Sequence, residues 1–239
     1  MSAFSFSFLY KDENIAIIDK PVGVTPDECI EDITNQLLDT HLESPVRDRI
    51  VVTPIGQMDR AASGIQIYGL NLKSSRELKK ALNSKHLYRG YFALVKGDIS
   101  KPGGFQFPLM DSEGEMCKSL TCFEPQKSFN IATLLKVWLE TDCKDQIRKH
   151  FSRRWMPVIG DRKYGQKKWN DFFKQQLGLN RLFLHVYHLT LDIKEYNHPI
   201  EIDCPLPACL KEVLEKLDLL TSNPVTAYNA RIRLNFSGC

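Results

Sequence analysis

Residues 182–189, with the sequence Leu-Phe-Leu-His-Val-Tyr-His-Leu, are apolar on both alternations of an extended chain. Side chains of a strand point to opposite faces in turn, so this pattern is typical of a central strand that is covered on both faces. His185 and His188 lie on opposite faces of it. We expect them to be hydrogen-bonded interior or rim histidines, because no further ligand at a metal-binding spacing accompanies them.

Strand-like and helical patterns follow one another along the rest of the chain, which favours a mixed fold. A polar cluster at 11–14 between two apolar runs predicts a hairpin, whose second strand ends at Lys20-Pro21-Val22-Gly23. A capping box at Ser74-Ser75-Arg76-Glu77 opens one helix, and Asp142 is expected to cap another. A loop is expected over 40–54. The predicted strands span 8–10, 15–18, 88–95 and 131–139, and the predicted helices span 27–38, about 74–85 and about 207–219.

Length, hydropathy and cysteine usage limit the class of protein. The 239 residues suffice for a substantial core, and no apolar run reaches the roughly 18 residues of a membrane span. Residues 1–8 lack the basic and apolar parts of a secretion signal, so we expect a cytoplasmic protein without a membrane partner. Seven cysteines, an odd number, favour reduced thiols over a disulfide framework, and their spacings do not suit structural zinc.

Charge is concentrated in one segment. Residues 144–181 hold 11 Lys and Arg against 3 Asp, a local charge of +8, whereas the whole chain carries +3. Aromatic residues are interleaved with these cations at Phe151, Trp155, Tyr164, Trp169, Phe172 and Phe173. Cations mixed with stacking rings suit a polyanion, with nucleic acid as the first candidate. A solvated basic face over an aromatic core explains the same pattern equally well, so both interpretations stay open.

A carboxylate and a guanidinium stand side by side in the glycine-bounded segment 56–64, Gly-Gln-Met-Asp-Arg-Ala-Ala-Ser-Gly. A carboxylate at a loop-to-strand junction can act as nucleophile or base, although Asp59 and Arg60 alone are more often a surface ion pair. Further along, Arg148 sits at the edge of a helical face formed by Ile147 and Phe151. There it either points into solvent or reaches a carboxylate.

Taken in order, these segments resemble the RluA-type family of RNA pseudouridine synthases over roughly residues 8–203. The family's Lys-Pro-x-Gly is matched at 20–23, its His-Arg-Leu-Asp-Arg-x-Thr-Ser-Gly at 56–64, and its Lys-x-Tyr-x-Ala-x-Val-x-Gly strand at 89–97. Its Thr-Gly-Arg-x-His-Gln-Ile-Arg-x-His is matched at Thr141, Gln146, Ile147, Arg148 and His150, and the loop 157–165 and residues 181–185 match as well. The loop and the basic insert look like the TruC branch, which modifies transfer RNA.

The resemblance implies a fold and residue roles. The pseudouridine synthase fold is α+β, with a mixed, mostly antiparallel central sheet flanked by helices. We expect it as one catalytic domain over 1–220, without an N-terminal S4-like domain, followed by a loosely held tail over 221–239. Asp59 falls on the catalytic aspartate, Tyr91 on the active-site tyrosine and Arg148 on the arginine that pairs with that aspartate. The residues expected to contact RNA are Gln57, Arg60, Lys149, Arg153, Arg154, Lys163, Lys167, Lys168 and Leu184.

Three departures from the family bear on recognition. Gly56-Gln57 replaces His-Arg, so the arginine thought to replace the extruded base in the helix is missing. Asp142-Cys143 replaces Gly-Arg, and Asp145 replaces the histidine before Gln146. The last two changes place acid near Arg148, and we expect them to weaken contact with RNA there.

The implied reaction breaks the bond from N1 to C1′ of uridine and forms one from C5 to C1′, which needs no cofactor or metal. An ionised Asp59 can attack the sugar or remove a proton to give a glycal, and attack at the base is also open. A neighbouring guanidinium favours the ionised form. We therefore expect a monomeric RNA pseudouridine synthase that acts on transfer RNA, with ribosomal RNA second. The alternatives are a catalytically silent RNA-binding folding factor and a hydrolase that uses Asp59 as base.

Overall fold

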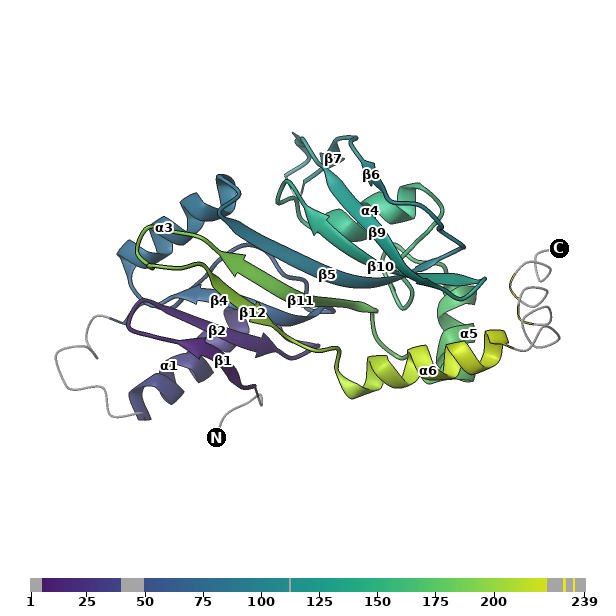
Figure 1. Ribbon diagram of the computed structural model, residues 1–239, viewed down its shortest axis with the longest axis horizontal. Coiled ribbons are helices and arrows are strands. Elements are labelled where there is room, and N and C mark those ends of the chain that lie inside the picture. Colours follow the sequence, from purple (N-terminus) through teal and green to yellow (C-terminus); the bar gives the residue numbers. More distant parts are fainter. Residues whose placement is uncertain (1–5, 40–49, 112, 223–229, 231–233, 235–239) are drawn as a thin grey trace. The chain divides into compact units, whose positions relative to one another are not determined.

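A computed structural model describes residues 6–39, 50–111, 113–222, 230 and 234. The chain divides into two compact units, each built from two separate stretches (Figure 1). The first unit comprises 1–90 and 185–204, and the second comprises 91–184 and 205–239. The division falls inside the strand β5 (Leu87–Lys96), after Gly90.

The first unit is a sheet covered by a helix. Its elements are β1 (Phe8–Lys11), β2 (Ile15–Lys20), a 3-10 helix (Asp27–Cys29), α1 (Ile30–Asp39), β3 (Thr53–Pro54), β4 (Ser63–Gly69), α3 (Leu72–Asn83), most of β11 (Leu184–Leu191) and β12 (Ile200–Asp203). The strand order is β1-β2-β4-β11, with β3 beside β4 and β12 beside β11. β4 pairs with β11 in parallel, whereas the β1-β2, β2-β4, β3-β4 and β11-β12 pairs are antiparallel. Ile33 and Leu37 of α1 are buried against Ile18 and Tyr68 of this sheet.

The second unit is a sheet with helices on both faces. Its elements are β6 (Gly103–Phe105), β7 (Leu109–Met110), β8 (Met116–Cys117), β9 (Thr121–Ser128), β10 (Ala132–Leu139), α4 (Gln146–Arg153), α5 (Lys167–Leu177) and α6 (Ala208–Ser222), and its sheet follows the order β5-β10-β9-β6 (Figure 1). Leu134 of β10 belongs to the core formed with α5 and α6. Phe123, which pairs with Val137 of β10, packs instead on Phe151 of α4. Because residues 134 and 137 point to opposite faces of β10, α4 covers one face and α5 with α6 the other.

The predicted fold class is confirmed, as are the hairpin β1-β2, the helices α1, α3 and α6, and the strands β5, β10 and β11. The predicted interior or rim histidines are confirmed too. His185 is buried between the Ser63 hydroxyl and the Cys204 carbonyl oxygen, and His188 contacts the carboxylate of Asp203.

Three local predictions were wrong. The capping box opens at Asn71, whose side chain accepts from the Ser74 N–H, so α3 begins two residues earlier than predicted. α4 begins at Gln146, after Asp145 in the left-handed region at φ 59°, so Asp142 does not cap it. Of the predicted loop over 40–54, positions 40–49 lie outside the described residues, while Thr53–Pro54 forms the short strand β3.

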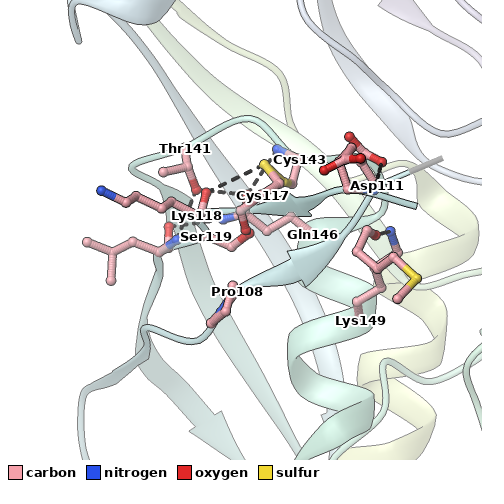
Figure 2. The surroundings of a disulfide bond; sticks show 12 residues. Pro108, Asp111, Cys117, Lys118, Ser119, Thr141, Cys143, Gln146 and Lys149 are labelled. Carbon is pink, nitrogen blue, oxygen red and sulfur yellow. Dashed lines mark hydrogen bonds between the residues drawn. A yellow bond between two sulfur atoms is a disulfide. The ribbon is translucent and has the colours of Figure 1, made fainter. Parts of the chain in front are cut away.

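The expectation of reduced thiols is contradicted by a disulfide between Cys117 and Cys143 (Figure 2). The two cysteines are 26 residues apart, and their spacing gives no sign that the β7-β8 hairpin lies against α4. The structure shows this contact directly, because Nζ of Lys149 in α4 donates to the Met110 carbonyl oxygen in β7 at 2.8 Å. Among the described cysteines, those outside the disulfide are Cys29, Cys122, Cys204 and Cys209.

The expected tail over 221–239 is described at four positions only. Two of these, Ala230 and Leu234, are buried in the core formed with α5 and α6. The carbonyl oxygen of Leu234 also accepts a hydrogen bond of 2.7 Å from Nζ of Lys168 in α5. At these two positions the end of the chain is therefore part of the second unit.

Candidate catalytic residues and their surroundings

A buried lysine fixes the loop that carries Asp59. Lys20 is 0% exposed, and its Nζ donates to the carbonyl oxygens of Pro21, Val24 and Ala62, each at 2.8 Å. Three acceptors match the three N–H groups of an ammonium, which offsets the cost of burying the charge. Lys20 thus ties the end of the first hairpin to the loop 56–62. From the sequence Lys20 is predicted only to end a strand and to match the Lys-Pro-x-Gly motif. A lysine that closes an otherwise apolar strand is the signal that could have indicated its burial.

Arg60 supports the same loop from the surface. The Gly23 N–H donates to the Arg60 carbonyl oxygen at 2.7 Å, and Nη1 of Arg60 donates back to the Gly23 carbonyl oxygen at 2.9 Å. Nη2 of Arg60 pairs with Glu28, and 57% of the Arg60 side chain is exposed. The pKa of Glu28 is lowered, first by the Thr25 N–H and then by Arg60. Next to it Asp59 is half-buried, and its carbonyl oxygen closes the turn by accepting from the Ala62 N–H.

A buried arginine explains the glycine at position 56. Gly56 has φ 74°, and a Cβ there would lie 2.7 Å from Nη1 of Arg89. Arg89 is 8% exposed, so its guanidinium fills the space into which a side chain at 56 would project. Gln57, which stands where the family has arginine, is exposed, and Met58 is buried.

In the second unit Arg148 is held by two carboxylates. Its Nε and Nη2 donate to the two oxygens of Asp161, each at 2.8 Å, and Nη1 donates to Asp145 at 3.3 Å. Its guanidinium carbon lies 5.0 Å from the centre of the Tyr164 ring. Arg148 and Asp161 are 7% and 1% exposed, so this is a buried bidentate pair.

The two carboxylates are themselves fixed. Asp161 accepts from the backbone N–H groups of Lys163 and Tyr164 at 2.8 and 2.9 Å. Asp145 accepts from Nζ of Lys163 at 2.8 Å and from the Tyr164 hydroxyl at 2.7 Å. The hydrogen bond with Asp145 raises the pKa of Lys163, and burial raises the pKa of Tyr164. Asp145, a departure from the family, does place acid beside Arg148, and Lys163 balances its charge.

A buried amide anchors the start of α4. Oε1 of Gln146 accepts from the Thr141 hydroxyl and the Cys143 N–H, at 2.9 and 3.0 Å. Its Nε2 donates to the Leu120 carbonyl oxygen and the Thr121 hydroxyl, both at 3.0 Å. All four hydrogen-bonding positions of the amide are therefore used, and the helix that presents Arg148 is fixed to β9.

His150 fixes the same helix one turn later. Its Nδ1 lies 2.8 Å from the Thr121 hydroxyl and its Nε2 lies 3.0 Å from the Phe107 carbonyl oxygen. His150 is fully buried, and burial lowers its pKa. Thr141, Gln146 and His150, recognised from sequence as one motif, thus form the frame behind Arg148.

The remaining predicted site residues divide between buried side chains and surface cations. Tyr91 and Leu184 are 5% and 4% exposed. Arg60, described above, contacts residues of the first unit. The other predicted RNA-contacting cations all have contacts within the second unit: Lys149 with the Met110 carbonyl oxygen, Arg153 with the Pro108 carbonyl oxygen, Arg154 with the rings of Phe105 and Phe107, Lys163 with Asp145, Lys167 with Asp171, and Lys168 with the Leu234 carbonyl oxygen. Among them Arg153, Arg154, Lys163 and Lys167 are exposed. Lys149 is partly buried, which lowers its pKa.

The structure brings Arg148, Lys163 and their carboxylates together in the second unit, which also holds Tyr91, and it places Asp59 and Arg60 in the first. In the part of the chain that the structure describes, no three His, Cys, Asp or Glu side chains are grouped as metal ligands. Nor does any described helix have the length and apolar character needed to cross a membrane.

Comparison with known proteins is consistent with these motifs. Residues 14–153 match the family described as RNA pseudouridylate synthase. The tRNA pseudouridine synthase C of Haemophilus ducreyi is 27% identical over 207 residues, covering 76% of this chain and 84% of the relative. The ribosomal large subunit pseudouridine synthase C of Buchnera aphidicola is 27% identical over 228 residues, covering 90% and 71%. Human RNA Pseudouridylate Synthase Domain Containing 4 shares the fold, with a TM-score of 0.72 and 20% identity, over 88% of this chain and 92% of the other.

Proposed function

Since the chain belongs to the RNA pseudouridylate synthase family, its activity is the isomerisation of uridine in RNA, and we propose that its substrate is transfer RNA. The loop 157–165 and the basic segment 144–181, which resemble the TruC branch, support this choice, as does the similarity to a relative named tRNA pseudouridine synthase C. Ribosomal RNA is the second candidate, because a relative named for the large ribosomal subunit aligns with 90% of the chain. We also propose a cytoplasmic monomer, which light scattering and cell fractionation test.

In the proposed mechanism Asp59 is the carboxylate that acts at the uridine. As nucleophile it attacks C1′ and releases the base at N1; as base it removes a sugar proton to give a glycal. In the nucleophilic route the base turns and its C5 bonds to C1′ as the bond from C1′ to the Asp59 carboxylate breaks. In the glycal route the turned base bonds through C5 to C1′ and the proton held by Asp59 returns to C2′. In both routes the proton on C5 is then lost. The backbone and Lys20 contacts of the loop 56–62 support a fixed position for this carboxylate. Tyr91 is proposed to stack on the uracil.

Arg148 is proposed to orient Asp59. Asp161 and Asp145 accept from Nε, Nη2 and Nη1 of its guanidinium, which fixes the orientation of the group that is proposed to pair with Asp59. The group formed by Arg148, Lys163, Asp145 and Asp161 has two positive and two negative charges. What Arg148 offers is therefore an N–H donor in a fixed direction, not a net positive charge.

The experiment measures tritium released from RNA labelled at C5 of uridine, with transfer RNA and a ribosomal RNA fragment as substrates. Wild type is compared with Asp59→Asn and with Asp27→Asn, a control on an exposed carboxylate of the same unit. We expect release from transfer RNA by wild type and by Asp27→Asn, and none by Asp59→Asn. RNA binding without release by wild type would favour the folding factor, and strand breaks or free uracil would favour the hydrolase.

A further inference from the structure

The aromatic residues of the basic segment do not share one environment. Phe151, Trp169 and Phe173 are buried in the second unit, and Tyr164 and Phe172 are half-buried. Trp155 is 76% exposed, the largest exposed fraction among the described large hydrophobic side chains. A solvated basic face over an aromatic core therefore accounts for most of these rings, but not for the exposure of Trp155.

The backbone conformation at residue 155 also disfavours a tryptophan. α4 ends in a reversal in which the Trp155 N–H donates to the Ser152 carbonyl oxygen and the Met156 N–H donates to the Phe151 carbonyl oxygen, both at 3.0 Å. This Schellman motif places residue 155 in the left-handed region, at φ 60°. Glycine is the usual residue there because a Cβ is unfavourable at positive φ.

Two other helices are also followed by a residue in the left-handed region. After α3 this residue is Lys85, at φ 65°, and the His86 N–H donates to the Ala81 carbonyl oxygen at 3.0 Å. α5 ends with Gly178 at φ 78°, whose N–H donates to the Lys174 carbonyl oxygen. At the end of α4 the protein instead has the largest side chain, in a strained conformation and mostly in solvent. Neither burial nor backbone preference stabilises this choice. A mostly exposed tryptophan at such a position is therefore a candidate for a role in binding.

The neighbours of Trp155 indicate what it binds. Arg153 and Arg154 precede it, and both are exposed. The guanidinium of Arg153 lies 5.7 Å from the centre of the Phe107 ring, and that of Arg154 lies 5.3 Å from it. These contacts restrict two cations next to an exposed indole. A flat ring beside fixed cations suits a base and its flanking phosphates.

We propose that Trp155 stacks on an unpaired base of the RNA substrate, with Arg153 and Arg154 contacting the neighbouring phosphates. The inference rests on the proposed function and adds to it a substrate class, RNA that presents an unpaired nucleotide in a loop or at an end. A continuous duplex does not offer this contact, because its bases are stacked on one another.

The experiment compares wild type, Trp155→Gly and Trp155→Phe in binding a single-stranded 12-nucleotide oligouridylate and a 12-base-pair RNA duplex. Loss of one stacked base is expected to weaken the single-strand affinity of Trp155→Gly roughly tenfold and to change the duplex affinity less than about twofold. Trp155→Phe is expected to recover part of the loss. Oligouridylate is also expected to quench the tryptophan fluorescence of wild type more than that of Trp155→Phe, which a purely electrostatic contact would not produce.

The control is Leu219→Ala, which shortens another exposed apolar side chain of the same unit, 75% exposed in α6. It is expected to bind both RNAs as wild type does. Trp155→Gly removes a strained residue, so its melting temperature is not expected to fall. Equal single-strand affinity of Trp155→Gly and wild type, or equal losses for single strand and duplex, would overturn the stacking role. Tritium release measured on the same variants tests the proposed function separately, because it depends on Asp59.

Discussion

Arg148 and Asp161 form a buried bidentate ion pair, with both N–H···O distances at 2.8 Å and the Asp161 side chain 0% exposed. Asp161 lies in the loop after α4, and backbone N–H groups of that loop hold its carboxylate. The arginine is therefore placed by a carboxylate 13 residues away in sequence. Family motifs predict a functional role for Arg148, but they do not show this support.

Removing that support is expected to destabilise the second unit. Asp161→Asn leaves the buried guanidinium with Asp145, at 3.3 Å, as its carboxylate partner, and loss of one member of a buried pair costs up to about 3–5 kcal/mol. The matched control is Asp171→Asn, which breaks the exposed pair with Lys167 and should cost less than about 1 kcal/mol. Urea denaturation measures both. Similar losses for the two variants would show that the Arg148 pair contributes no more than a surface pair.

The Lys20 contacts predict a loss of both stability and turnover. Lys20→Met leaves three buried carbonyl oxygens without their donor and is expected to lower the free energy of unfolding by about 3 kcal/mol. The loop that carries Asp59 loses one of its attachments, so tritium release should also fall under conditions in which the variant stays folded. Lys11→Met, at an exposed position of the same hairpin, is the control. Full activity in folded Lys20→Met would show that this lysine is not needed to position the loop.

Gly56 is expected to tolerate a side chain less well than other glycines at positive φ. Gly56→Ala and Gly97→Ala share the backbone penalty, since φ is 74° and 98°, but a Cβ at 97 meets nothing within 4 Å. The excess loss at 56, about 1–3 kcal/mol, measures the clash with Arg89. In Gly56→Ala/Arg89→Lys the shorter side chain should recover part of that excess. Equal losses in the two single variants would show that Arg89 moves aside freely.

Protonation of His150 is expected to destabilise the protein in mild acid. Burial lowers its folded-state pKa from 6.5, so below that pH the unfolded chain binds a proton that the folded chain does not. The free energy of unfolding should then fall as the pH drops from about 6.5 to the folded-state pKa, and this contribution is fully present above 6.5. His150→Gln should flatten this part of the profile measured by denaturation. The exposed His198→Gln should not; an unchanged slope in His150→Gln would assign the effect to other groups.

The disulfide should stabilise the second unit. A cross-link that closes a loop of 26 residues restricts the unfolded chain by about 3.5 kcal/mol in the chain-entropy account. Cys117→Ser/Cys143→Ser is expected to lose stability of this order, whereas Cys209→Ser, which changes an exposed free thiol, should not. A reducing agent should shift the denaturation midpoint of wild type and leave that of the double variant unchanged. A wild-type midpoint insensitive to reduction would contradict the assignment.

Apolar patterns in the sequence predicted the elements in which apolar residues recur at strand or helix spacing. The hairpin β1-β2, the strands β5 and β11, and the helices α1 and α6 are of this kind. α5 was not predicted, because its many charges hide the apolar spacing of Trp169, Phe173 and Leu177. The starts of α3 and α4 depend on individual side-chain bonds at Asn71 and Gln146, which a periodic pattern does not contain.

The order of the motifs predicted the family. The sequence did not predict most contacts between residues that are distant in the chain. No pattern in the sequence predicts that Glu28 pairs with Arg60, Asp161 with Arg148 or Cys117 with Cys143. Such partners are chosen by the folded backbone, which brings distant residues within hydrogen-bonding reach. The pairing of Asp59 with Arg148 and the single domain over 1–220 stay predictions.

The strand β5 passes from the first unit into the second, and residues 185–204 belong to the first unit again. Each unit is therefore encoded by two separate segments of the gene. A premature stop codon between the codons for 91 and 184 would leave the first unit without β12 and the second without α6. Half-length fragments are therefore poor candidates for folding on their own. Mutations that truncate the chain there are expected to abolish the protein rather than to release a working part.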